Sequence, residues 1–196
     1  MSNLQVKYQP PARPTAAASG LATAQYPVPL PYPEVAVAGP NLWYARLLHD
    51  VAFGAESELT AIHEYSYWAV MTDIEQLRGL FESFARDEMR HMEMFMKAIR
   101  KLCGDPRYVD GRGVPWCSTN VYYGYRDCDR LAKAYEDELA AAANYRRLAG
   151  VIGDPHLQAL LERIAKDEDQ HARLSAEWMR QTCGYYPGNF RPGTGQ

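Results

Sequence analysis

The 196-residue chain carries a formal net charge of −3 and has an isoelectric point near 6.0, so it lacks the strong positive charge of a nucleic-acid-binding protein. It contains no run of about 18 consecutive apolar residues, which excludes a transmembrane helix. The small-residue run 15–24 is too weakly hydrophobic for a secretory signal. We therefore expect one cytoplasmic domain without nucleic-acid or membrane partners.

Residues 1–40 are rich in proline, alanine and tyrosine and show no helical period. Closely spaced prolines, as in the segment QYPVPLPYPEVAVAGP at 25–40, block helices and central strands. We expect an extended arm that lies along the domain or reaches a neighbouring subunit, with a mobile tail as the alternative. We expect residues 185–196 to form an irregular tail at the other end.

A helical period begins after Pro40, and two helices are expected before residue 105. Asn41 is a suitable N-cap for a first helix that runs to about Met71. The sequence Thr72-Asp73-Ile74-Glu75 has the form of a capping box, so a second helix should open there and end near Cys103-Gly104.

A long connection follows, from about residue 105 to residue 126, and two more helices come after it. The third is expected at about 127–152, and the fourth opens at Asp154-Pro155 and ends at Gly184. Tight turns within each pair make neighbouring helices antiparallel, and the long connection must travel the length of the bundle. The predicted fold of residues 41–184 is an all-α four-helix bundle with one long crossover, built from two repeated helix pairs.

The second helix pair repeats the first, because each matched residue has its counterpart 80 positions later, as in Glu58 and Glu138. The matches are Glu56/Glu136, Glu58/Glu138, Leu59/Leu139, Ala61/Ala141, Tyr65/Tyr145, Ala69/Ala149, Leu77/Leu157, Leu80/Leu160, Glu82/Glu162, Ala85/Ala165, Asp87/Asp167, Glu88/Glu168 and His91/His171. A bundle of two similar halves can build a two-metal site on its pseudo-two-fold axis.

Each half contains one Glu-x-x-His motif, Glu88–His91 in the first and Glu168–His171 in the second. Side chains at i and i+3 share one face of a helix. Both motifs interrupt an apolar stripe that should be buried, where an uncompensated carboxylate would cost several kcal/mol. Glu58 and Glu138 lie on the corresponding stripes of the leading helices, whereas Glu56 and Glu136, which are about 200° round the helix, face solvent.

Four buried carboxylates beside two neutral imidazoles need cations, and two divalent ions would balance the charge. Mixed oxygen and nitrogen ligands suit Fe or Mn better than structural zinc. We therefore predict two Mn ions, two Fe ions or one of each, held by Glu58, Glu88, His91, Glu138, Glu168 and His171.

Tyr65 and Tyr145 follow the predicted ligands Glu58 and Glu138 by two turns on the same face. They are either core residues or hydrogen-bond donors to the ligands, and both interpretations stay open. The remaining histidines, His49, His63 and His156, have no such partners and are expected to be surface or packing residues.

The four cysteines, Cys103, Cys117, Cys128 and Cys183, form no C-x-x-C pair, which argues against a zinc ribbon or a rubredoxin-type iron site. A disulfide near the long connection is conceivable, but reduced thiols are favoured for a cytosolic chain.

The stretches ESELTAIHEYSYW, FARDEMRHMEMF, EDELAAAANYRR and IAKDEDQHARL resemble the rubrerythrin and manganese-catalase branch of the ferritin-like di-metal carboxylate superfamily. The resemblance covers residues 41–183 and implies the six residues named above as ligands. It also implies a homo-oligomer whose substrate is hydrogen peroxide or dioxygen. The chain departs from the branch in lacking paired C-x-x-C motifs and in being shorter than typical manganese catalases; it is more similar to short catalase-like proteins, including spore- or shell-associated ones.

The resemblance implies a di-metal oxidoreductase that acts on hydrogen peroxide, with Glu88 and Glu168 as bridging ligands. Disproportionation is favoured over reduction because reduction needs an external electron donor. One alternative is a ferroxidase or iron-storage component. The other is a structural coat or cargo protein in which the metals only stabilise the bundle.

Overall fold

The computed structural model describes residues 28–184; residues 1–27 of the expected arm and the expected tail 185–196 lie outside the described part. No β-strand occurs between residues 28 and 184, and no helix there is long and apolar enough to cross a membrane. The elements are α1 (Leu42–Phe53), α2 (Glu58–Met71), α3 (Glu75–Lys101), the short 3-10 helix η1 (Ser118–Asn120), α4 (Asp127–Val151) and α5 (Pro155–Cys183).

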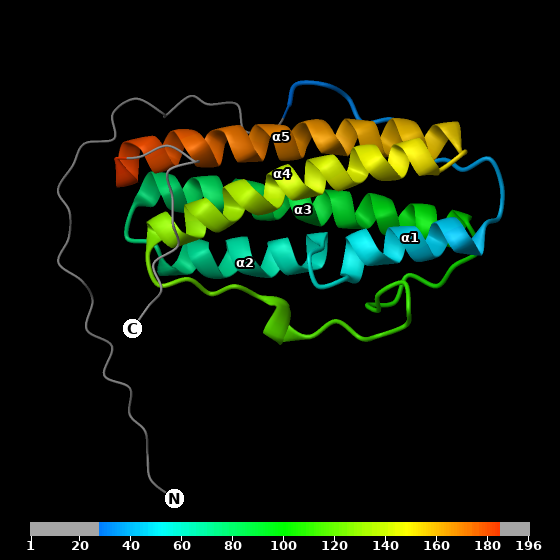
Figure 1. The fold of residues 1–196 in the computed structure, drawn as a ribbon, viewed down its shortest axis with the longest axis horizontal. Coiled ribbons are helices and arrows are strands. Elements are labelled where there is room, and N and C mark those ends of the chain that lie inside the picture. Colours follow the sequence, from blue (N-terminus) through cyan, green and yellow to red (C-terminus); the bar gives the residue numbers. More distant parts are fainter. Residues whose placement is uncertain (1–27, 185–196) are drawn as a thin grey trace, which may run out of the picture.

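The helices form a four-helix bundle in which α1 and α2 lie end to end and together take the place of one long helix (Figure 1). α3 packs against both of them, and α4 packs along the length of α5. The connection from α3 to α4 runs along the outer side of α1 and α2 (Figure 1), where the indole of Trp68 donates to the carbonyl of Tyr122 at 2.8 Å. The predicted all-α four-helix bundle with one long crossover is confirmed.

The prediction of one continuous helix from Asn41 to Met71 is wrong, because the chain breaks at residues 54–57. Gly54 has extended backbone (ψ −172°) while its N–H still donates to the Asp50 carbonyl at 2.9 Å. A Cβ on Gly54 would collide with that carbonyl oxygen, so glycine suits this turn. Ser57 then caps α2 by accepting from the Thr60 N–H at 3.4 Å. The break makes Glu58 the first residue of a helix, where the helix dipole favours a carboxylate.

The start and the end of α5 are capped as the sequence predicts, but the start of α3 is not. α3 begins at Glu75 without a side-chain cap, since the Thr72 hydroxyl accepts from the Ile74 N–H at 3.2 Å instead of closing a capping box. The opening of α5 is as predicted, because Asp154 accepts from the second and third residues of the helix at 3.0 and 3.4 Å. Its end is also as predicted, with Gly184 in the left-handed conformation (φ 73°).

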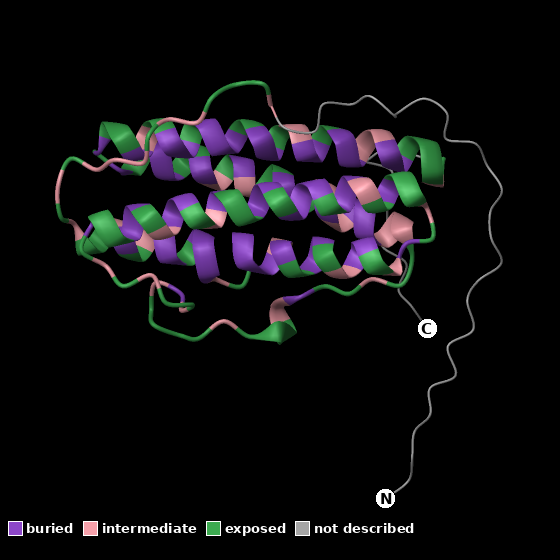
Figure 2. Cartoon of the chain, turned by 180° about the vertical axis from the view of Figure 1, so that it is seen from behind, coloured by how far each residue is buried: buried purple, intermediate pink, exposed green. Residues whose placement is uncertain are grey.

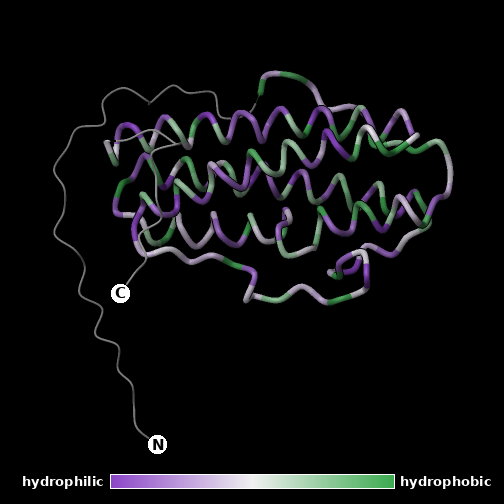
Figure 3. Tube along the Cα trace, viewed as in Figure 1, coloured by the Kyte–Doolittle hydropathy of each residue, from purple (hydrophilic) through white to green (hydrophobic). Residues whose placement is uncertain are grey.

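The apolar core consists of two separate clusters, one toward each end of the bundle. One joins α1 to the second half of α3 and to the turn between α4 and α5; the other joins α2, the first half of α3, the start of α4 and the end of α5. Buried residues line the inward faces of the helices (Figure 2), and hydrophobic and hydrophilic residues alternate along each helix (Figure 3). The middle of the bundle, between the two clusters, is where the repeated polar residues lie.

Cys128 and Cys183 form a disulfide, so the expectation that all four thiols are reduced is wrong. The antiparallel packing of α4 on α5 brings the first turn of one helix beside the last turn of the other, with the two Cα atoms 5.9 Å apart. A separation of 55 residues in the sequence gave no sign of this pairing. Cys103 and Cys117 are exposed free thiols.

Residues 28–40, the described part of the arm, begin over α5 and then pass round the end of the bundle to the start of α1 (Figure 1). The Arg163 guanidinium donates to the carbonyls of Leu30 and Val28, at 2.7 and 3.2 Å. The Ala38 N–H donates to the Asp154 carboxylate at 2.6 Å. The described part of the arm is therefore attached to α5 at Arg163 and at the cap residue Asp154.

Candidate metal centre

All six residues that the repeat singled out lie in the middle of the bundle, between the two apolar clusters. Four helices supply them, and none is more than 4 % exposed. α2 provides Glu58, α3 provides Glu88 and His91, α4 provides Glu138, and α5 provides Glu168 and His171. An antiparallel bundle with two similar halves thus brings residues 80 positions apart to one point.

The six side chains form two groups of four that could each hold a metal ion, and in each group the potential ligand atoms lie within 4.8 Å of one another. Glu88 and Glu168 belong to both groups. Glu58 and His91 complete the first group, which we call the His91 position. Glu138 and His171 complete the second, which we call the His171 position.

The two histidines face the centre with the same ring nitrogen. Nδ1 of His91 lies 3.1 Å from Glu88 and 3.2 Å from Glu168. Nδ1 of His171 lies 2.9 Å from Glu88 and 3.3 Å from Glu168. Nε2 of each ring points the other way, at 3.1 Å from Asp167 for His91 and 3.5 Å from Asp87 for His171. The hydrogen bond to Asp167 fixes the tautomer of His91 that leaves Nδ1 free to bind a metal, whereas Asp87 lies near His171 Nε2 without a hydrogen bond to it.

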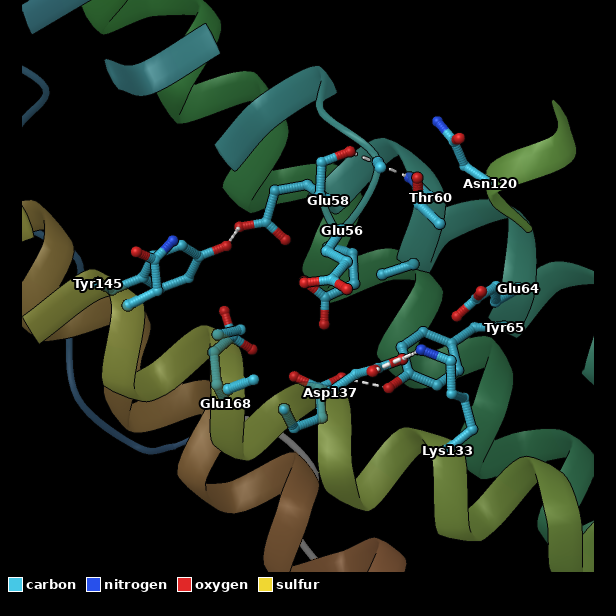
Figure 4. Close-up of a pocket in the computed structure, with 18 residues that line it drawn as sticks. Glu56, Glu58, Thr60, Glu64, Tyr65, Asn120, Lys133, Asp137, Tyr145 and Glu168 are labelled. Atoms are coloured by element: carbon cyan, nitrogen blue, oxygen red, sulfur yellow. Dashed lines mark hydrogen bonds and ion pairs between the residues drawn. The ribbon is translucent and has the colours of Figure 1, made fainter. Parts of the chain in front are cut away.

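Tyr65 and Tyr145 are both buried core residues and hydrogen-bond donors, and each donates across the bundle to the other half. The Tyr145 hydroxyl donates to Glu58 at 2.6 Å, as the dashed line in Figure 4 shows, and the Tyr65 hydroxyl donates to Glu138. Burial, reinforced by these carboxylates, raises the pKa of both phenols well above its usual value, so both remain protonated donors.

The electrostatics of the centre show that the group of carboxylates needs positive charge. Burial and the charge of Glu88 raise the pKa values of Glu58 and Glu138 well above the usual range. Burial acts to raise the Glu88 pKa too, but hydrogen bonds from Glu58 and the histidines hold it well below its usual value. Burial alone would lower the pKa values of His91 and His171, but the surrounding carboxylates raise both. Protons thus supply here the charge that divalent cations could supply instead.

Several buried oxygens of the candidate ligands form no well-directed hydrogen bond within the described part of the chain. Both carboxylate oxygens of Glu168 and Oε1 of Glu88 are among them, although each residue is only 1 % exposed and a histidine Nδ1 lies near each of these oxygens. Buried carboxylate oxygens almost always form hydrogen bonds, so oxygens that lack them and converge on a single point are suited to cations. This donor set of oxygen and imidazole nitrogen fits Mn or Fe.

A pocket of about 460 Å³ between α2 and α4 reaches the centre (Figure 4). Glu58, Glu138, Tyr65 and Tyr145 contribute to its walls, together with Glu88 and Glu168 from the helices behind. A second set of polar residues, which is not part of the predicted centre, also lines it: Glu56, Glu64, Lys133 and Asp137. A small solute can therefore approach from the α2 and α4 side, while the histidines close the opposite side.

The residues that the sequence assigned elsewhere stay outside the centre. Glu56 and Glu136 are exposed, although they repeat as well as the ligand candidates do. His49 is buried, with Nδ1 2.9 Å from the carbonyl of Val109. His63 and His156 are exposed.

Sequence reasoning missed four residues around the centre. Asp87 and Asp167 precede the glutamates of the two motifs, and their repetition was a signal of a role that received no interpretation. Tyr32 and Arg163 have no counterpart in the repeat, so no pattern indicated that Tyr32 approaches His91 or that Arg163 pairs with Asp167.

A family model described as a ferritin-like domain matches residues 55–183. The chain is 26 % identical over 147 residues to the uncharacterised protein YhjR of Bacillus subtilis, covering 75 % of this chain and 90 % of that one. It is 29 % identical over 136 residues to a bacterioferritin of Desulfovibrio desulfuricans, covering 65 % and 70 %.

Two further likenesses are to manganese catalases. A protein named as a probable manganese catalase of Clostridium acetobutylicum is 24 % identical over 165 residues, which cover 74 % of this chain and 73 % of that one. The crystal structure of KatB, a manganese catalase from Anabaena, superposes with a TM-score of 0.75 at 19 % identity and covers 86 % of this chain and 85 % of the other. At this identity, the likeness to KatB shows a shared fold.

Proposed function

Because the chain belongs to the family of ferritin-like domains, we propose that its centre binds two redox-active ions, Mn or Fe, and disproportionates hydrogen peroxide. The observation that carries the proposal is the pair of buried four-residue groups that share Glu88 and Glu168. Glu88 and Glu168, which belong to both groups, would hold both ions. Glu58 and His91 would hold one of the ions, and Glu138 and His171 would hold the other.

When bound, such a metal pair supplies the two-electron exchange in which one hydrogen peroxide is oxidised to dioxygen and a second is reduced to two waters. The two protons that the first peroxide releases are the two that the second consumes. The pocket gives a molecule as small as peroxide a path to Glu58 and Glu138 from the solvent side. Tyr145 and Tyr65 keep these two carboxylates in place by hydrogen bonds.

Glu64 can hold protons on this path. It lines the pocket, is 4 % exposed, and accepts a hydrogen bond from the Tyr122 N–H at 2.7 Å. Burial raises its pKa to about 7, so it exchanges protons with water in the pocket at neutral pH.

An oxygen electrode tests the proposal. Metal-free protein is loaded with Mn(II) or Fe(II) and given hydrogen peroxide; we expect one dioxygen for every two peroxides consumed. Glu138→Ala should abolish oxygen release, while Glu136→Ala, which removes an exposed carboxylate two residues away on the same helix, should retain it. Protein that carries two bound ions per chain and still releases no oxygen from hydrogen peroxide would overturn the proposal.

A second candidate function, oxidation of ferrous iron by dioxygen, is favoured by the charge of the pocket. Glu56, Glu64 and Asp137 line it with one basic side chain, Lys133, which already pairs with Asp137 at 2.6 Å. Such a pocket attracts divalent cations. The similarity to a bacterioferritin supports the same reading. Rapid oxygen consumption on aerobic addition of Fe(II), with mineral retained in an assembly, would favour this function over peroxide chemistry.

A further inference from the structure

The two halves of the centre differ behind their histidines, and we propose that this difference makes the two metal positions unequal, so that the His171 position binds its cation more tightly and fills first. Tyr32 and Arg163 act as positioning residues that set the difference. The inference rests on the proposed metal centre and adds an order of binding to it.

Behind His91, one carboxylate oxygen of Asp167 has three partners. Oδ2 lies 3.1 Å from Nε2 of His91, accepts from the Tyr32 hydroxyl at 2.6 Å, and lies 2.7 Å from Nη1 of Arg163. The side chains of Arg163 and Asp167 are 6 % and 1 % exposed, so their opposite charges offset each other away from water.

The arm holds this arrangement together. The Arg163 guanidinium lies 4.2 Å from the centre of the Tyr32 ring, and its N–H groups donate to the backbone carbonyls of Leu30 and Val28. Tyr32 also lies edge-on to the His91 ring, with centroids 6.0 Å apart. The arm thus contributes a phenol to one metal position.

Behind His171, the corresponding carboxylate has no such partners. Oδ2 of Asp87 lies 3.5 Å from Nε2 of His171, and within residues 28–184 neither a lysine nor an arginine forms an ion pair with Asp87. The residue 80 positions before Arg163 is Ser83, which is buried and uncharged. The repeat therefore keeps both aspartates but places a counter-charge beside one of them.

Asp87 forms no hydrogen bond with Nε2 of His171, so it acts on a bound cation through its charge. A buried negative charge attracts a cation strongly through a medium of low dielectric constant. The Asp87 carboxylate is 0.4 Å farther from its histidine than the Asp167 carboxylate is (3.5 against 3.1 Å). This lengthening reduces a Coulomb attraction only slightly, whereas the Arg163 charge offsets most of the attraction of Asp167. The extra negative charge therefore lies on the His171 side.

The test is an anaerobic titration of the metal-free protein with Mn(II), followed by calorimetry and by electron paramagnetic resonance. We expect two steps that differ about tenfold in affinity, the size of effect typical of partners behind metal ligands. The first equivalent should give the signal of an isolated Mn(II) ion. Anomalous diffraction from half-loaded crystals should place that ion at the His171 position.

Variants then separate the two sides. Asp87→Asn should weaken Mn(II) binding in the first step about tenfold. Arg163→Gln and, to a smaller extent, Tyr32→Phe should strengthen Mn(II) binding in the second step, so the two affinities become more similar. Tyr44→Phe, which removes a phenol whose oxygen accepts from the Gly153 N–H far from the centre, is the control and should change neither step. If Arg163→Gln does not fold, the Asp87→Asn titration decides.

Two equal steps in the wild-type protein, or a first ion at the His91 position, would overturn this inference and leave the proposed metal centre standing. A first step that Asp87→Asn does not weaken would also overturn it. Failure to bind any Mn(II) would overturn the proposed centre itself.

Discussion

Tyr145 illustrates how single side chains hold the centre, because its hydroxyl is a close donor to the buried carboxylate of Glu58. Replacing it by phenylalanine leaves that carboxylate without its donor, so Tyr145→Phe should lower the free energy of unfolding by about 1–3 kcal/mol. Denaturant unfolding of the metal-free protein measures this. Tyr67→Phe is the control, since Tyr67 is half-buried, packs against Tyr123 and the apolar cluster of α2, and has no hydrogen bond from its hydroxyl to a described residue. Equal losses in both variants would contradict the role of the hydrogen bond.

Glu64 gives a prediction about pH, because burial raises its pKa from 4.5 to about 7. Between these values the folded protein holds a proton that the unfolded chain has released. Stability is therefore lost as the pH rises through this window and stays lower above it. Glu64→Gln cannot ionise, so the loss of unfolding free energy between pH 5 and pH 8 should be smaller by roughly 2 kcal/mol.

The measurement for Glu64 is denaturant unfolding at several pH values, with wild type and variant in the same metal state. Glu136→Gln changes an exposed carboxylate on α4 and serves as the control. If the unfolding free energy of Glu64→Gln falls with pH as steeply as that of the wild type, Glu64 does not hold a proton in the folded protein.

At the level of the helices, the break between α1 and α2 is the main local departure from a regular bundle. Gly54→Ala should destabilise the protein by about 1–3 kcal/mol, since the new Cβ meets the Asp50 carbonyl oxygen. Gly79→Ala, within α3 and with no atom within 4 Å of the new Cβ, should instead stabilise it by about 0.5–1 kcal/mol. Opposite shifts in melting temperature are expected. If both substitutions destabilise the protein, the loss in Gly54→Ala does not show a particular need for glycine at the break.

The disulfide between Cys128 and Cys183 joins the start of α4 to the end of α5. A bridge that closes a chain segment of 55 residues restricts the unfolded state, and its loss should cost about 3–4 kcal/mol. Cys183→Ser should show this as a lower denaturant midpoint. Cys117→Ser, at an exposed free thiol, should leave the midpoint unchanged. A midpoint in Cys183→Ser equal to that of Cys117→Ser would contradict the predicted contribution.

Helix positions could be predicted because apolar periodicity and caps such as Asp154 are local features. The break at Gly54 was missed because the apolar stripe continues across it, although Gly54 and the cap Ser57 were both visible. The pairing of Cys128 with Cys183 depends on which helix ends meet. That is a property of the packed bundle and not of either segment.

At the scale of the whole molecule, two apolar clusters enclose a polar middle, and the internal repeat explains why the sequence could locate it. A repeated polar residue carries a signal twice, and its position on a buried apolar stripe distinguished Glu58 from the equally repeated Glu56. Tyr32 and Arg163 occur once and meet across 131 residues (163 − 32), so nothing in the sequence pointed to their contact.

The central claim is that six buried residues hold two metal ions, and the metal content of the loaded, desalted protein tests it most directly. The structure predicts two Mn or Fe ions per chain in the wild type and a loss of both in Glu168→Ala, because Glu168 belongs to both positions. Glu136→Ala, on the exposed face of α4, should keep two. A folded wild-type chain that retains one ion or none under saturating metal would contradict the claim.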